Sequence, residues 1–197
     1  MKKTIALSLL LILVLSLAAC TPVADENLNS YSEAIKSTSI AGAKIEVSFH
    51  HTAFDVNIEG EYTVSLNEDG SATVKYWYDE LNSDTLDNDA DLLERVSDQV
   101  AYVAADGTVT GNLDGTVAAA VQCKMDLIPE KIEECKIERG VLTATVKAAN
   151  TKAVFGVDLG YDATLDMRLD GEAISSYSIR YTTDEGSANI VCTYTNK

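Results

Sequence analysis

The sequence predicts a mainly β fold of the α+β kind, in which one large, curved antiparallel sheet forms an unclosed half-barrel. Three observations predict it. Apolar and polar residues alternate with a period of two over residues 43–66 and again over 163–194, as in strands with one buried face. Helical spacing is confined to an N-terminal stretch and one or two inserted segments. So few helices cannot cover a sheet of roughly eight strands, so we expect it to curl on itself or form a sandwich.

The N-terminal third begins with a predicted helix and continues as a meander. Apolar residues recur at helical spacing over residues 26–36, which predicts a short amphipathic helix. Alternation then predicts strands at 43–50, 54–66 and 72–78. The run 67–70, Asn-Glu-Asp-Gly, is a turn signal between the last two strands. The third strand places Tyr76 and Tyr78 on the buried face and Trp77 on the opposite face.

The middle of the chain is less regular. Residues 90–96 predict a short helix. The pair Asp106-Gly107 is a hairpin signal, and it joins expected strands at 100–105 and 108–112. An alanine-rich stretch over 117–127 predicts an inserted helix that ends before a proline.

The C-terminal third returns to strands. Alternation predicts them at 142–146, 163–169, 177–181 and 188–194. Turn signals lie at Asp170-Gly171 and at 184–186. Residues 150–160 are expected to form an irregular, glycine-containing connection.

The first twenty residues have the layout of an export signal. A basic start, Met1-Lys2-Lys3, precedes an apolar run over 4–17 and then small residues. The segment Leu17-Ala18-Ala19-Cys20 resembles the bacterial lipobox, in which the cysteine thiol is acylated with diacylglycerol and the chain is cut just before it. The alternative is an ordinary signal peptide with a chance cysteine. We expect Cys20 to anchor the protein to the cell membrane, facing outside the cytoplasm, through two or three acyl chains such as palmitate.

The expected organisation is a signal peptide over 1–19, a lipidated cysteine and tether over 20–27, and a single β-rich domain over 28–197. The 178 residues left after cleavage suffice for one domain with a sizeable core. Because two lysines leave with the signal, the net charge changes from −16 to −18. A charge of this sign repels nucleic acid, which excludes nucleic-acid binding as an expected function.

Three cysteines remain in the mature chain. Cys192 alternates in phase with buried residues and is expected to point inward. Cys123 and Cys135 are then the plausible disulfide pair, since export permits disulfides. The alternative, in which all three thiols stay reduced, is left open by the sequence.

The order of elements resembles the LolA/LolB/LppX-like group of lipoprotein carriers. The resemblance rests on the helix ENLNSYSEAIKS, the strands AKIEVSFHH and FDVNIEGEYTVSL, and the hairpin ATLDMRLDGEAISSYSIRYTTDEGSANIVCTYT. It covers most of residues 26–197. It implies an unclosed barrel with helices at its mouth and a lipid or acyl chain in the apolar concavity. No residue of known function carries over, because no specific motif is shared.

The sequence shows no constellation for catalysis. His50 and His51 are adjacent on a strand, so they face opposite sides and cannot share one substrate or metal ion. The acidic run 87–91 begins like a calcium-binding loop, but Leu92 replaces the required glycine and Asp98 the required glutamate. Helix capping explains that run equally well. We therefore expect no enzyme activity, no cofactor and no metal site.

Two functions remain. The first is a non-catalytic lipoprotein that binds an apolar or amphiphilic, lipid-like ligand in the concave face of the sheet. Its candidate lining residues are Phe49, Val56, Ile58, Tyr62, Val74, Tyr76 and Met167. The alternative is an envelope scaffold or sensor with a fully packed core and a protein partner.

Overall fold

The structure is a computed structural model that describes residues 25–82, 92–122 and 125–197. The ten strands are β1 (Ile40–His51), β2 (Val56–Leu66), β3 (Ala72–Leu81), β4 (Leu93–Val103), β5 (Val109–Thr110), β6 (Ile132–Glu138), β7 (Val141–Val146), β8 (Ala163–Asp170), β9 (Ala173–Thr182) and β10 (Gly186–Asn196). They form one antiparallel sheet in the order β5-β4-β3-β2-β1-β10-β9-β8-β7-β6. Because β5 and β6 are its edges, the sheet is unclosed, which confirms the predicted class.

The two ends of the chain meet at the centre of the sheet, where β1 pairs with β10. Each predicted strand overlaps an observed one, although β1, β3, β4 and β9 extend three to seven residues beyond the predicted bounds. The alternation is as expected: in β2, Tyr62 and Val64 are buried, while Thr63 and Ser65, which alternate with them, are exposed. The sheet between its two edge strands therefore has one buried face.

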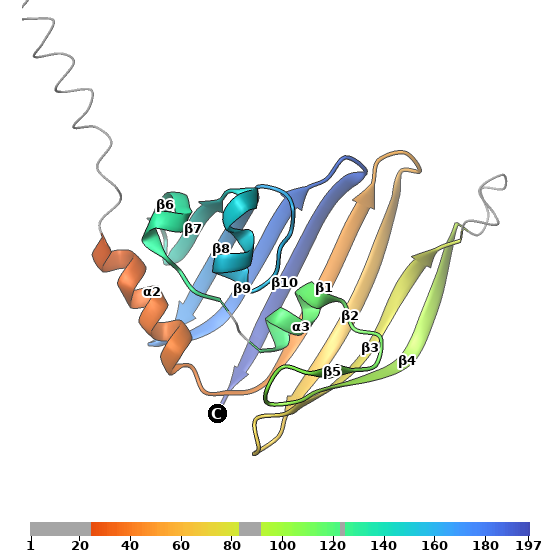
Figure 1. Cartoon of the computed structure of the whole chain (residues 1–197), viewed down its shortest axis with the longest axis horizontal. Helices are drawn as coiled ribbons and strands as arrows, with labels where there is room; N and C mark the ends of the chain where they lie inside the picture. Colours follow the sequence, from red (N-terminus) through yellow and green to blue (C-terminus); the bar gives the residue numbers. More distant parts are fainter. Residues whose placement is uncertain (1–24, 83–91, 123–124) are drawn as a thin grey trace, which may run out of the picture.

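Three α-helices accompany the sheet in the described part of the chain: α2 (Asp25–Ser37), α3 (Gly115–Val121) and α4 (Thr151–Phe155). Figure 1 shows them on one side of the sheet, which curves around them. There are also two short 3₁₀ turns. The first, η2 (Pro129–Lys131), precedes β6, and the second, η3 (Ala148–Asn150), precedes α4. We name the side covered by α3 and α4 the helix face, and the opposite side the outer face.

Each helix has a local reason to form and a buried side. In α2, Leu28, Tyr31 and Ala34 are spaced along one face, and all three are buried. The Tyr31 hydroxyl also donates to the carbonyl oxygen of Gly140 at 3.2 Å, which ties α2 to the β6–β7 turn. The Asp114 carboxylate caps α3 by accepting from the backbone N–H of Thr116 at 2.7 Å.

The core lies between the helices and the sheet and is filled. Ile45, Leu165, Met167 and Val154 have no exposed surface. The hollow enclosed by α3, α4 and the sheet has a volume of only about 10 Å³, which is the room of one water molecule. The helix face under α3 and α4 is therefore packed core.

The structure corrects three expectations. The prediction of a helix at 90–96 is wrong for the described residues of that range, because Leu93–Val103 is the strand β4. A bulge between the pairs Tyr76–Gln99 and Tyr78–Val96 shifts its alternation by one residue, which removes the period-two signal. The helix predicted at 117–127 ends at Val121, and the connection at 150–160 contains α4. No strand was predicted at Ile132–Glu138, where the structure has β6.

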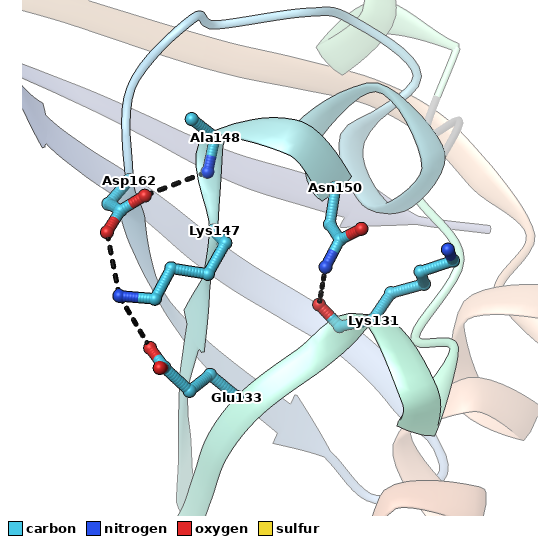
Figure 2. Close-up of polar contacts among 6 residues, drawn as sticks. All are labelled: Lys131, Glu133, Lys147, Ala148, Asn150 and Asp162. Carbon is cyan, nitrogen blue, oxygen red and sulfur yellow. Dashed lines mark hydrogen bonds and ion pairs between the residues drawn. The ribbon is translucent and has the colours of Figure 1, made fainter.

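An ion-pair cluster holds the excursion that carries α4. Figure 2 shows Lys147, which follows β7, between Glu133 of β6 and Asp162 at the start of β8, with both nitrogen-to-oxygen distances at 2.9 Å. Hydrogen bonds to Asp162 and Glu133 raise the pKa of Lys147 well above its usual range. Asp162 also accepts from the backbone N–H of Ala148 at 2.9 Å, and its pKa is lowered by Lys147 and by this bond. The cluster fixes where the chain leaves and rejoins the sheet.

Candidate functional site

The structure divides the seven expected ligand-lining residues into two groups. Four are core residues, with side chains that are at most 7% exposed: Tyr62, Val74, Tyr76 and Met167. The remaining three are half-buried and lie outside the cluster of buried residues: Phe49, Val56 and Ile58. Because the first four are packed in the core, they do not line an open cavity for a ligand. The candidate ligand-binding surface is therefore limited to the second group.

This second group lies at the end of the β1–β2 hairpin. Phe49 pairs with Ile58 on one side and with Ala188 on the other, so the three form a row across β2, β1 and β10. Val56, at the start of β2, pairs with His51 of β1. We name Phe49, Phe54, Val56 and Ile58 the hairpin patch. In Figure 1 the β1–β2 turn lies at the upper edge of the sheet, away from α2 and α3.

The patch belongs to the helix face because of strand register. Ile45 is fully buried in the core, and Phe49 lies four residues further along β1, so both side chains point to the same side. Ala188, the β10 partner of Phe49, lies two residues from Ile190, which lines the hollow under α3 and α4. The hairpin patch is thus the part of the helix face that extends beyond the helices.

Aromatic contacts organise the patch. The His51 ring lies edge-on to Phe49 with 6.0 Å between centroids, and 4.7 Å from the Phe54 ring. The Nδ1 atom of His51 is buried and has no hydrogen-bond partner among the described residues. Gly186 is required next to Phe49, since a Cβ there would lie 1.9 Å from the His50 carbonyl oxygen. The patch is therefore apolar with one hydrogen-bonding ring beside it.

Three tyrosines of β2 and β3 form a stack. Tyr62, Tyr76 and Tyr78 stack in sequence, with centroid distances of 5.1 and 6.0 Å. The Tyr76 hydroxyl donates to the carbonyl oxygen of Asn112, in the loop before α3. Burial, followed by the negative charge of Asp114, raises the pKa of Tyr62 to about 12. The pKa values of all three tyrosines are raised, so the rings are neutral at physiological pH.

The two histidines lie as predicted, on opposite faces of the sheet. His50 is on the outer face, where its Nδ1 atom lies 3.1 Å from Oδ1 of Asn57, whereas His51 is on the helix face. Within the described ranges, no three His, Cys, Asp or Glu side chains are grouped so that they could hold a metal ion. The acidic run 87–91 lies outside the described residues.

The expected modification sites are described only in part. Cys20 and Cys123 lie outside the described residues, so lipidation and the Cys123–Cys135 disulfide both stay predictions. Cys135 is half-buried on β6, and burial raises the pKa of its thiol. Cys192 is fully buried, as its phase predicted. None of the helices in the described ranges is long and apolar enough to cross a membrane.

Sequence reasoning did not anticipate hollows on the outer face. One has a volume of about 620 Å³ and lies on the far side of the hairpin end from the patch. A second hollow of about 220 Å³ adjoins it through Ser48 and Asn189. The polar residues that line them alternate with core residues, which made them look like an ordinary solvated face.

Comparisons with known proteins give no family. No family model matches the chain, and no curated protein matches it. Among solved structures, LprF from Mycobacterium bovis is 9% identical, with 87% of this chain and 93% of that chain covered and a TM-score of 0.46. The redesigned β-barrel mFAP1, bound to DFHBI, is 10% identical over 83% of this chain and 100% of its own, with a TM-score of 0.22.

The dehydratase domain of the CurK module of Curacin polyketide synthase is 7% identical, with 90% of this chain and 82% of that domain covered and a TM-score of 0.23. All three TM-scores are below 0.5, so these likenesses carry no argument about ligand or activity.

Proposed function

We propose that this protein is a lipid-anchored, extracytoplasmic, non-catalytic protein that binds an apolar or amphiphilic ligand at the hairpin patch. The observation that carries the proposal is the half-buried apolar surface of Phe49, Val56 and Ile58, which extends beyond the helices on a chain of net charge −16. Apolar side chains that lie together at a surface can bind an apolar ligand or a partner. The element order, which resembles that of the lipoprotein carriers, supports the same function.

The patch suits an acyl chain better than a polar ligand. Phe49, Val56 and Ile58 are apolar, and each Å² of apolar surface removed from water contributes ~25 cal/mol. Each methylene of a ligand that becomes buried adds ~0.8 kcal/mol. His51, whose Nδ1 atom is unpaired within the described part of the chain, supplies a hydrogen-bonding group beside the apolar surface. An amphiphile with one polar end fits this combination.

Anchoring would keep the patch near its ligand. The proposed lipid on Cys20 lies five residues before the first residue of α2. Five residues span at most about 18 Å even when fully extended. A domain so tethered stays close to the membrane surface, where amphiphiles are concentrated.

A second candidate function is an envelope scaffold or sensor. The cavity under α3 and α4 has a volume of only about 10 Å³, which favours this function, because a carrier with an internal ligand site would have a larger cavity there. In this case the hairpin patch is a contact surface for a protein partner. The two functions differ in whether the isolated domain holds a lipid.

Native mass spectrometry of residues 21–197 tests the proposal. We expect an added mass that chloroform extraction removes and identifies as an amphiphile. The variant Phe49→Ser should lose that mass and keep the charge-state distribution of a folded protein. A wild-type spectrum without added mass, also after incubation with lipid vesicles, would leave the scaffold as the function.

A further inference from the structure

The outer face of the sheet contains a groove that the function proposed above does not use. It has a volume of about 620 Å³, within the range of small-molecule sites. The side chains that point into it from the outer face are Ser48, His50, Asn57, Asp162, Thr164, Arg180, Thr182, Ser187 and Asn189. All nine are polar, so this groove differs in kind from the hairpin patch behind it.

Strand register arranges these side chains in two parallel rows. One row runs across four strands through Thr182, Ser187, His50 and Asn57. The neighbouring row runs through Thr164, Arg180, Asn189 and Ser48. Since adjacent strands are about 4.8 Å apart, each row is about 14 Å long. The rows present a linear series of hydrogen-bonding groups rather than a single polar point.

The groove is nearly neutral although the chain is strongly acidic. Arg180 forms an ion pair with Asp166, and Asp162 forms one with Lys147 at 2.9 Å. The other groups are four hydroxyls, two amides and an imidazole, which both donate and accept hydrogen bonds. A ligand that likewise donates and accepts without carrying charge matches them.

Asn189 is the central residue of this surface. Its side chain lines both the 620 Å³ groove and the adjoining hollow of about 220 Å³. Its Oδ1 atom is buried and has no hydrogen-bond partner in the parts of the chain that the structure describes. The adjoining hollow also reaches Trp77, with the Arg95 guanidinium 3.9 Å from the centre of its ring. The polar surface therefore continues beyond the groove toward an aromatic side chain.

We propose that this groove binds a neutral oligosaccharide. Sugar hydroxyls donate and accept hydrogen bonds, as the lining hydroxyls and amides do, and a linear sugar chain fits rows about 14 Å long. A peptide strand is disfavoured, because β1, β2, β9 and β10 each pair with a strand on both sides and offer no edge to extend. An anionic sugar is disfavoured by the net charge of −16.

Isothermal titration calorimetry tests this inference with the full chain, purified in a detergent that has no sugar headgroup. The probes are the neutral hexasaccharides of glucose (β-1,4 and α-1,4), xylose and N-acetylglucosamine, and the anionic hexamer of galacturonic acid. We expect saturable binding of at least one neutral probe and none of the anionic one. Asn189→Ala should weaken that binding about three- to tenfold, as loss of one or two hydrogen bonds does.

Thr193→Ala is the matched control, since Thr193 lies on the same strand and the same face but outside the groove. We expect it to change the affinity by less than about twofold. Ser48→Ala is a second groove variant, which should also weaken binding if Asn189→Ala fails to fold. The inference is overturned if no neutral probe binds, if the anionic probe binds equally well, or if the groove variants and the control behave alike. The outcome of this experiment does not depend on whether the hairpin patch binds a ligand.

Discussion

At the scale of the residue, burial decides what each apolar side chain of the helix face does. Met167 has no exposed surface, so Met167→Ala leaves a cavity and should lower the free energy of unfolding by about 2–5 kcal/mol. Ile58 is half-buried, so Ile58→Ala should lower it by less than about 1.5 kcal/mol. Urea unfolding followed by circular dichroism measures both. Equal losses for the two variants would show that the hairpin patch is core.

Ionisation of the buried tyrosines should limit stability at high pH. The pKa of Tyr62 is raised to about 12, mainly by burial, whereas a tyrosine in the unfolded chain titrates near ~10. Its neutral form is favoured in the folded state, so its contribution to stability is complete below pH ~10 and is lost as the pH rises toward about 12. Tyr62→Phe, which has no proton to lose, should show a smaller fall in unfolding free energy over this window. An unchanged fall would mean that other groups dominate alkaline unfolding.

At the scale of the element, the loop of the β6–β7 hairpin holds a non-glycine residue in a strained backbone conformation that a substitution could relieve. Its two-residue loop is Arg139-Gly140, and both residues have positive φ angles, 52° and 75°. This loop conformation favours Asn-Gly, because asparagine adopts the left-handed region more easily than arginine. We expect Arg139→Asn to raise the free energy of unfolding by about 0.5–1 kcal/mol. A β-branched control, Arg139→Val, should lower it, and a gain in that control would contradict the explanation.

The elements that the sequence predicted are those with uninterrupted alternation. β2, β8 and β10 keep a strict period of two, because one face packs on the core and the other meets water. β9 keeps it only from Tyr177 on, where the predicted strand began, because a bulge in its pairing with β8 shifts Ile174 out of phase. The first half of β4 could not be recognised as a strand, since the bulge near Asp98 reverses the phase of burial within the strand. β6 is an edge strand with mostly polar residues, and only its pairing with β7 makes it a strand.

The candidate site was predicted less completely than the fold. Phase along a strand assigned all seven ligand-lining residues to the helix face, but it could not distinguish covered from uncovered parts. That difference depends on where α3 and α4 lie, and it separates Tyr62 and Val74 from Phe49 and Ile58. The outer groove could not be predicted either, because it arises from cross-strand register between residues up to 141 positions apart, such as Ser48 and Asn189.

At the scale of the whole molecule, the first prediction concerns the anchor. Cys20→Ser removes the thiol that the lipobox-like segment offers for acylation. We expect the variant to be released from the membrane fraction or to stay uncleaved, since two or three acyl chains provide stable attachment. Cell fractionation and metabolic labelling with a fatty acid measure this, with Cys192→Ser as the control cysteine. Normal processing and membrane retention of Cys20→Ser would exclude the anchor.

In the function proposed above, the hairpin patch, and not the covered core, binds an apolar ligand. Ile58→Lys places a charge within the patch, whereas Ser65→Lys places the same charge on the outer face of the same strand. Titration of residues 21–197 with a fluorescent fatty acid, on variants shown to be folded, compares them directly. We expect saturable uptake by the wild type and Ser65→Lys and at least about tenfold weaker uptake by Ile58→Lys, since a desolvated charge costs more than about 1.4 kcal/mol. No uptake by the wild type, or equal uptake by all three proteins, would contradict it.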